Sequence, residues 1–155
     1  MLRGTSIVLT AAAAILAIAG CGSKKNDLAP AACLVGNKGY LRALERAPGE
    51  VRLAGTTPIS ECLVPAQDGG QLANVGGPMV IAATKLNAEA RRGSAPAALQ
   101  LGYLSGAVAK GADAIHADLV RRLNSAAQFS ETGSTLPASF QRSFGRGYAA
   151  GHTSG

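Results

Sequence analysis

Apolar residues recur along the second half of this chain at the three- and four-residue spacing of an amphipathic helix. The longest such pattern lies in residues 68–92 and comprises Leu72, Val75, Met79, Ala83, Leu86 and Ala90. Asp68 and Gln71 have the spacing of a capping box at its start, and Gly93 follows its end. Pro78 falls inside the pattern, so we expect the helix either to kink there or to begin there.

A second helix is expected between Ser94, as its N-cap, and Gly111. It carries an apolar stripe of Ala97, Leu101, Leu104 and Val108 and, beside it, a line of small residues, Ala98, Gly102 and Gly106. Each glycine inside a helix costs about 1 kcal/mol relative to alanine. The line of small residues therefore predicts that a neighbouring helix approaches closely here.

Two further helices are expected after residue 112. The first has Asp113 as its N-cap. Its inward positions are predicted to be Ile115, Leu119, Leu123 and Ala126, and its outward positions Asp118, Arg121, Arg122 and Gln128. The second covers about residues 136–150, where Phe140, Phe144 and Tyr148 are four apart. For these rings, packing in the core is favoured over a ligand groove or a membrane contact, and the tail 151–155 is expected to fray.

The N-terminal third is less regular. Residues 34–47 predict one short amphipathic helix, which Pro48 ends. Thr57 and Pro58 have the arrangement of an N-cap and a first helical residue, so they predict one more helical turn. Together the patterns predict an all-α fold, a small bundle of about four to five helices.

Composition supports helices rather than a sheet. Aromatic residues make up 4% of the chain, tryptophan is absent, and 20 of the 155 residues are glycine. A core with so few large side chains must bring backbones close together, which favours helices with small-residue faces over strands. The sequence contains neither a phosphate-binding glycine loop nor a Gly-x-Ser-x-Gly nucleophile motif.

The N-terminus has the parts of an export signal. Arg3 lies in a short leader, residues 7–19 are apolar apart from Thr10, and small residues follow. This run is shorter than the roughly 20 apolar residues that a membrane-spanning helix needs. Residues 18–21 (Ile-Ala-Gly-Cys) resemble the lipobox of bacterial lipoproteins.

The resemblance implies a fate for the first part of the chain. Residues 1–20 would be removed as a signal peptide, and Cys21 would carry a diacylglyceryl group and an acylated (palmitate-type) amine. Residues 21–32 would be a lipidated tether, and residues 33–155 the helical domain. The lipid would hold the protein on the extracytoplasmic face of the cell membrane. The absence of aspartate directly after the cysteine resembles lipoproteins that two-membrane bacteria send to the outer membrane.

Three cysteines are present. If Cys21 is lipidated, Cys33 and Cys62 remain as an even pair in an oxidising compartment, and we expect a disulfide between them. Closing a loop of that length contributes about 3–4 kcal/mol in the chain-entropy model. A zinc site or a catalytic thiol is the weaker alternative, because neither cysteine has a sequence-linked histidine.

Asp113 and His116 would lie on one helical face, as metal ligands in helical bundles do. A dinuclear carboxylate site would need paired Glu-x-x-His motifs, which the sequence lacks. We therefore expect a cap and a surface or half-buried histidine, with no metal, no cofactor and no catalytic residue. His152 lies in the glycine- and serine-containing tail and is expected to be mobile rather than catalytic.

The formal net charge is +6, with a pI near 9.7. The basic residues come in separated pairs, and export takes the chain away from cytoplasmic nucleic acid, so no nucleic-acid partner is expected. Arg121 and Arg122, with Arg142 and Arg146, would form an anion-binding face if the helices align them; scattered, solvated arginines are the alternative. Anionic lipid or an anionic envelope polymer is the accessible partner.

The sequence thus predicts a membrane-anchored, exported lipoprotein that acts as a non-enzymatic binding or interaction module in the envelope. Its partners would be the membrane, through Cys21, and an envelope protein or anionic envelope polymer. The alternative is a small-ligand carrier with an apolar cleft between the helices that bear Leu101 and Phe140. Such a carrier requires a pocket of roughly 300 Å³ or more.

Overall fold

The computed structural model describes residues 28–130, 132–133 and 135–155. Within them the chain forms five α-helices: α1 (Gly36–Leu44), α2 (Gly69–Arg91), α3 (Ala95–Gly111), α4 (Ala117–Gln128) and α5 (Ala138–Ser154). Three short 3-10 helices join them: η1 (Ala31–Leu34), η2 (Ile59–Cys62) and η3 (Ala114–His116). The described residues form no strand, only an isolated bridge between Leu53 and Thr57. The predicted small all-α bundle is therefore confirmed.

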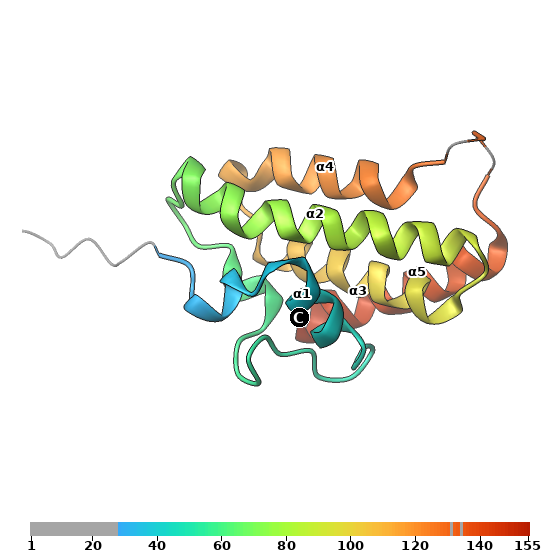
Figure 1. The fold of residues 1–155 in the computed structure, drawn as a ribbon, viewed down its shortest axis with the longest axis horizontal. Helices are drawn as coiled ribbons and strands as arrows, with labels where there is room; N and C mark the ends of the chain where they lie inside the picture. Colours follow the sequence, from blue (N-terminus) through green and yellow to red (C-terminus); the bar gives the residue numbers. More distant parts are fainter. Residues whose placement is uncertain (1–27, 131, 134) are drawn as a thin grey trace, which may run out of the picture.

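The helices are arranged around α3. Figure 1 shows α2 and α4 alongside each other, with α3 and α5 behind and below them and α1 packed beside α2. Every residue of α3 from Leu101 to Val108 is buried, and its most extensive contact is with α5. A helix that is apolar and buried on all sides belongs to the centre of a fold. In the part of the chain that the structure describes, no helix is long and apolar enough to cross a membrane.

Glycines bring the backbones of α3 and α5 into direct contact. A Cβ atom on Gly102 or Gly106 would overlap backbone atoms of α5. In the same way, a Cβ atom on Gly147 or Gly151 would overlap backbone atoms of α3. The predicted close approach of a neighbouring helix is confirmed, and α5 is that neighbour. Packing of two backbones replaces the large side chains that this composition lacks.

The contacts of these glycines also give the direction of the helices. Gly102 lies against Phe144 and Tyr148, whereas Gly106, one turn later, lies against Tyr148 and His152. Positions that advance together along both helices show that α3 and α5 run parallel. A parallel pair requires a crossover connection, and α4 provides it.

The helix ends follow the capping signals in most places. Asp68 accepts a hydrogen bond from the Gln71 N–H (2.8 Å), and Ser94 accepts one from the Ala97 N–H (3.2 Å). The Gln71 side chain donates to the Asp68 carboxylate (3.0 Å) rather than reaching the N-cap backbone, so only half of the capping box forms. Helix α2 runs continuously through Pro78, so the alternative prediction that the helix begins at Pro78 is wrong. The carbonyl that Pro78 leaves unbonded belongs to Asn74, which is exposed to water.

Three local predictions are wrong, two because the chain forms a different local turn and one because the tail packs against the rest of the fold. Ile115 is 44% exposed, since residues 114–116 form a 3-10 turn with three residues per turn and so leave the register of α4. Thr57 caps nothing, because its backbone N–H and C=O are bonded to Leu53. The tail 151–155 does not fray: α5 continues to Ser154, and Gly151 and Gly155 are buried.

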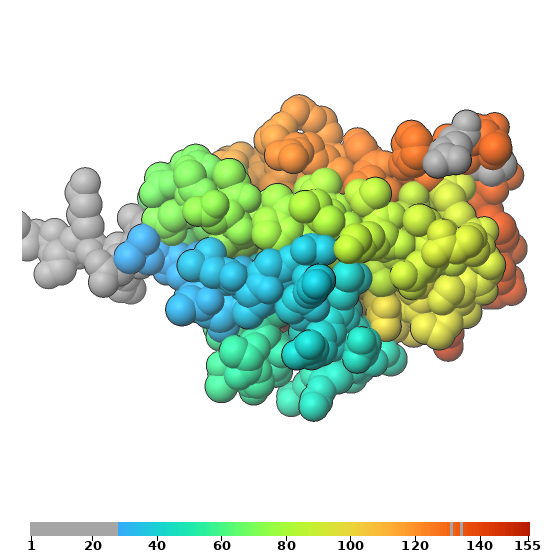
Figure 2. All heavy atoms as spheres, viewed as in Figure 1, coloured from blue at the N-terminus to red at the C-terminus, as the bar shows by residue number. Residues whose placement is uncertain are grey.

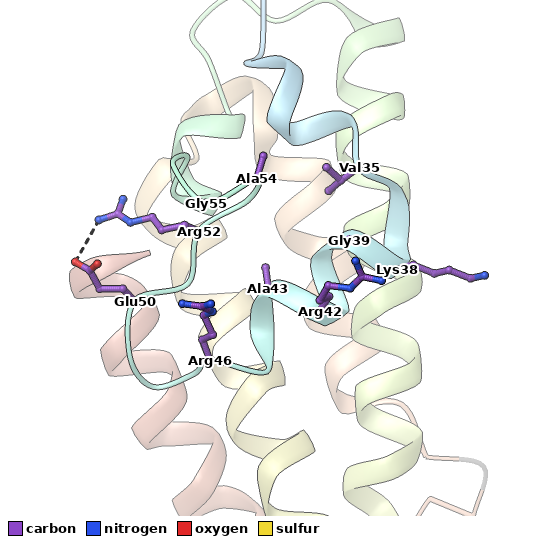
Figure 3. Close-up of a pocket in the computed structure, with 10 residues that line it drawn as sticks. All are labelled: Val35, Lys38, Gly39, Arg42, Ala43, Arg46, Glu50, Arg52, Ala54 and Gly55. Atoms are coloured by element: carbon purple, nitrogen blue, oxygen red, sulfur yellow. Dashed lines mark ion pairs between the residues drawn. The ribbon is translucent and has the colours of Figure 1, made fainter.

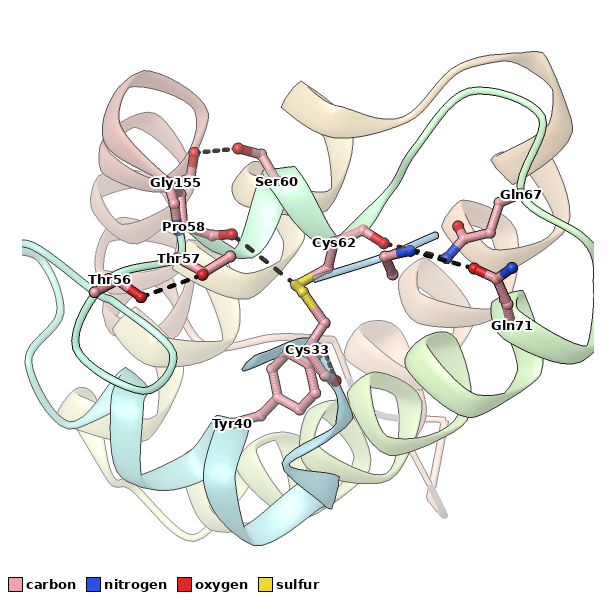
Figure 4. The surroundings of a disulfide bond; sticks show 11 residues. Cys33, Tyr40, Thr56, Thr57, Pro58, Ser60, Cys62, Gln67, Gln71 and Gly155 are labelled. Atoms are coloured by element: carbon pink, nitrogen blue, oxygen red, sulfur yellow. Dashed lines mark hydrogen bonds between the residues drawn. A yellow bond between two sulfur atoms is a disulfide. The ribbon is translucent and has the colours of Figure 1, made fainter. Parts of the chain in front are cut away.

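A disulfide joins the irregular N-terminal third to the body of the fold. Cys33 and Cys62 are bonded and both are fully buried, which confirms their predicted pairing (Figure 4). The buried Tyr40 hydroxyl donates to the Cys33 carbonyl (2.9 Å), and burial raises the pKa of this phenol. Nearby, the Ser60 hydroxyl donates to the Gly155 carbonyl (2.5 Å). Both ends of the described chain are thus held at η2.

Candidate anion-binding site

A large hollow lies between α1 and the loop that follows it. It has a volume of about 700 Å³. We call it the basic hollow, and its lining residues are Val35, Lys38, Gly39, Arg42, Ala43, Arg46, Glu50, Arg52, Ala54 and Gly55. Four of these side chains are basic and one is acidic. The hollow is therefore predominantly positive.

Helix periodicity and burial together produce this arrangement. Tyr40 and Leu44 bury one face of α1 against the fold, so Lys38 and Arg42, four residues apart, lie on the exposed face. Arg46 continues that spacing just beyond the end of the helix. The apolar floor between them consists of small side chains, which leaves room for a ligand.

The opposite wall comes from the loop at residues 48–57. Val51 and Leu53 are buried, so Arg52 between them points outward, as alternation along an extended segment requires. The loop turns back at Gly55, whose φ of +80° is a conformation that glycine adopts without strain. Figure 3 shows Arg46 near Arg52, Glu50 beside Arg52, Arg42 on α1 and Lys38 extending away from the others.

Most of the positive charge in the basic hollow is uncompensated. The Arg52 guanidinium lies 3.6 Å from the Glu50 carboxylate, which is a weak, largely exposed pair. Lys38, Arg42 and Arg46 form no ion pair with any residue that the structure describes. Guanidinium groups present forked N–H donors that match the oxygen atoms of phosphate and carboxylate. The hollow can therefore hold an anionic group.

The four arginines singled out from the sequence lie elsewhere. Arg121 forms an ion pair with Asp118, and Arg122 lines a small hollow that Asp118 shares. Arg142 and Arg146 line a separate hollow of about 470 Å³. The structure thus does not bring the α4 pair and the α5 pair into one hollow, and anion binding by either pair stays a prediction.

Sequence reasoning missed the basic hollow, although part of its signal was present. Lys38, Arg42 and Arg46 follow the spacing of one helical face, and in the sequence this spacing indicates only the polar side of the short amphipathic helix predicted at residues 34–47. Nothing local indicates that Arg52 folds back beside them. That position depends on the burial of Val51 and Leu53 against the rest of the fold.

His116 is fully buried, which corrects the expected surface or half-buried position. Its Nδ1 accepts a hydrogen bond from the Asp113 N–H (3.1 Å) and lies 2.8 Å from the carboxylate of the same residue. Its Nε2 bonds the Gln67 side-chain oxygen (3.1 Å), and the Gln67 amide donates to the Cys62 carbonyl (3.3 Å). Because both ring nitrogens have partners inside the fold, His116 serves to hold η3 against η2.

A second hollow, of about 370 Å³, lies beside Phe140 where α2 and α4 end and α5 begins. Leu136, Phe140 and Phe144 supply its apolar wall. The Arg91 side chain also reaches it, but its guanidinium donates to Asn87 (3.2 Å) and to the Gln128 carbonyl (2.8 Å). Leu101 is fully buried and does not line this hollow.

The aromatic stripe of α5 changes its surroundings along the helix. Phe140 is buried, Phe144 is half-buried, and Tyr148 is 38% exposed. Successive ring centroids are 6.1 Å and 6.4 Å apart, and His152 continues the stack 6.2 Å beyond Tyr148. His152 is thus in helix α5 rather than in a loose tail.

In the described residues, no three His, Cys, Asp or Glu side chains are grouped to hold a metal ion. Cys21 and the lipobox lie outside the described residues. Comparison of the chain with known protein families, with curated proteins and with solved structures found no match.

Proposed function

We propose that this chain is an exported lipoprotein, anchored in a membrane through Cys21, that acts as a binding module of the cell envelope. The observation that carries the proposal is the use of the three cysteines. Cys33 and Cys62 bond each other, which leaves Cys21 as the odd cysteine, and it follows a signal-like run at the position of a lipobox. A disulfide is also characteristic of exported proteins rather than cytosolic ones.

The chemistry of the basic hollow supports binding rather than catalysis. Arginine stays protonated at every physiological pH, so Arg42, Arg46 and Arg52 hold an anion but accept no proton from it. Their side chains are exposed or half-buried and reach an envelope partner without rearrangement of the core. An anionic envelope component is therefore the proposed ligand class.

Mass spectrometry of the protein purified from its native membrane tests the anchor. We expect a chain that begins at Cys21 and carries a diacylglyceryl group. The Cys21→Ala variant should lack the lipid and leave the membrane fraction, while keeping the Cys33–Cys62 disulfide. An uncleaved or unlipidated native N-terminus would overturn the proposal. The same two forms, used for capture from gently solubilised membranes, identify partners that depend on the anchor.

A second candidate function is that of a small-ligand carrier, favoured by the hollow beside Phe140. Its volume of about 370 Å³ is within the range of small-molecule sites, and aromatic rings form part of its wall. Titration with an apolar fluorescent probe tests it. We expect saturable binding that Phe144→Ala weakens and that Arg142→Gln, outside this hollow, leaves unchanged. An equal loss of probe binding in both variants would contradict the carrier function.

A further inference from the structure

Three exposed apolar side chains cluster in sequence at the start of the folded domain. Leu28 is 62% exposed, Leu34 59% and Val35 38%. Val35 also lines the basic hollow, so the exposed apolar residues and the basic ones meet there. Figure 2 shows the blue and cyan segments that carry them adjoining on one face of the molecule. We call this surface the N-terminal face, and it comprises Leu28, Leu34, Val35, Lys38, Arg42, Arg46 and Arg52.

This mixture of side chains matches the boundary between a bilayer and water. Exposed leucine and valine side chains gain by entering the region between headgroups and acyl chains. Lysine and arginine around them lie at the level of the phosphates, where an anionic leaflet attracts them. The single carboxylate in the hollow, Glu50, is already paired with Arg52 and is 80% exposed, so it turns towards water.

The proposed lipid anchor is attached close to this surface. Only seven positions separate Cys21 from Leu28 in the sequence. A chain of that length spans at most about 25 Å when fully extended. An anchor at Cys21 therefore keeps Leu28 within that distance of the bilayer, and the residues that follow it are the first part of the domain to meet the surface.

From this juxtaposition we propose that the N-terminal face docks on a bilayer of anionic phospholipid, with Leu34 and Val35 inserted and the basic hollow over lipid phosphates. This rests on the proposed membrane location and names the partner of the basic hollow. Helix α2 lies between α1 and α4 (Figure 1), so docking turns α4 away from the membrane. The lipid anchor on Cys21 then keeps the chain at the membrane, and the N-terminal face sets its orientation.

Vesicle co-sedimentation with residues 22–155 tests the docking without the lipid anchor. This chain is the mature protein after removal of Cys21, and it contains every residue that the structure describes, including the disulfide. Two vesicle types are needed, phosphatidylcholine alone and phosphatidylcholine with about one third phosphatidylglycerol. We expect binding only to the anionic vesicles, weakening as salt rises.

Variants on the face separate its two components. Replacing Arg42, Arg46 and Arg52 together by Gln should lower partitioning roughly 100-fold, since each basic residue near an anionic surface contributes about fivefold. Leu34→Ser should lower it by about fivefold at every salt concentration, because it removes an apolar contact. The matched control is Arg142→Gln with Arg146→Gln, which neutralises an exposed arginine pair on α5 and should leave partitioning unchanged.

Three results would overturn the proposal. The first is equal binding to neutral and anionic vesicles, and the second is an equal loss in the α5 control and the triple variant. The third is binding of a soluble phosphate polymer by the basic hollow with no binding to vesicles, which would give the hollow a different ligand. Since these vesicles meet an unlipidated chain, failure here leaves the mass-spectrometric test of the Cys21 anchor unaffected.

Discussion

The α3–α5 interface and the basic hollow use small residues in opposite ways. In the interface, Gly102 and Gly147 let two backbones touch, so that no space is left. In the hollow, Ala43 and Ala54 form a floor from which long basic side chains extend, so that about 700 Å³ stays open. The comparison suggests that stability is concentrated in the first region and binding in the second. Substitutions in each should then have separable effects.

The largest expected effect is on the interface. Gly147→Ala places a methyl group into the backbone of α3, so we expect a loss of about 3 kcal/mol or more in the free energy of unfolding. The matched control is Gly145→Ala, two residues earlier on the exposed side of α5, where a Cβ meets nothing within 4 Å. It should stabilise the helix by up to about 1 kcal/mol. Denaturant unfolding, followed by circular dichroism, measures both free energies of unfolding. Similar losses of stability in the two variants would contradict the backbone contact at Gly147.

The disulfide is expected to have the next largest effect, and it connects the two regions. Replacing Cys33 and Cys62 by Ser removes a cross-link between residues 29 apart and should cost about 3 kcal/mol. The N-terminal third should loosen first, because the cross-link holds it to η2. Hydrogen exchange should therefore rise more in α1 than in α3. Uniform acceleration across all helices would show that the two regions unfold as one unit.

A smaller loss of stability is expected for Gln67→Leu, which removes the side chain that joins His116 to the Cys62 carbonyl. It leaves the His116 Nε2 and the Cys62 carbonyl without their buried partner, and we expect a loss of about 2 kcal/mol. Exposed Gln128→Leu on α4 is the matched control and should change the free energy of unfolding by less than about 0.5 kcal/mol. If the two variants were equally stable, the hydrogen bonds of the Gln67 side chain would contribute nothing to stability.

Substitutions in the basic hollow should leave stability nearly unchanged. Arg42→Gln with Arg46→Gln alters exposed side chains that form no ion pair among the described residues. We expect a change within about 0.5 kcal/mol in the free energy of unfolding, together with a loss of anion-dependent vesicle binding. Thermal unfolding and co-sedimentation of the same preparation check both parts. A large destabilisation would place these arginines in the folding framework instead.

The smallest expected effect is acid-dependent and concerns the attachment of the N-terminal segment. The backbone N–H of Gln71 lowers the pKa of Asp68 from its ordinary 3.8, and Gln71 also accepts a hydrogen bond from the Ala29 N–H (3.2 Å). The stabilisation by ionised Asp68 is fully present above pH 3.8 and is lost as the pH falls through the lowered pKa. Asp68→Asn keeps a capping oxygen and should flatten this part of the acid unfolding profile. Identical profiles would argue against it.

Much of the helical framework was predictable, because its signals are local. The Asp68 and Ser94 caps begin α2 and α3 as expected, and the three- and four-residue apolar spacing identifies their faces. The predictions that Ile115 faces inward and that the tail 151–155 frays were wrong. Ile115 leaves the expected register because residues 114–116 form a 3-10 turn instead of the first turn of α4. The tail is held by the contact of Gly151 with α3, which no local pattern encodes.

The candidate site was predictable only in part. Lys38, Arg42 and Arg46 share a helical spacing that the sequence displays, but Arg52 joins them through the folding of a loop. The pairs Arg121–Arg122 and Arg142–Arg146 are the anion-binding candidates that the sequence indicates, but the packing of α4 and α5 places them in separate hollows. Charge in a sequence shows what a chain can attract, while its concentration depends on which surfaces meet.

By itself, the sequence determined most of the helices, the cysteine count that leaves Cys33 and Cys62 as a pair, and the signal-like N-terminus. Each of these depends on neighbouring residues or on simple counting. Only the tertiary structure decided that α3 and α5 run parallel in backbone contact, that His116 is buried, and that a loop closes the basic hollow. These features join residues far apart in the chain. Their free energy comes from shape and burial between surfaces, to which local propensity contributes nothing.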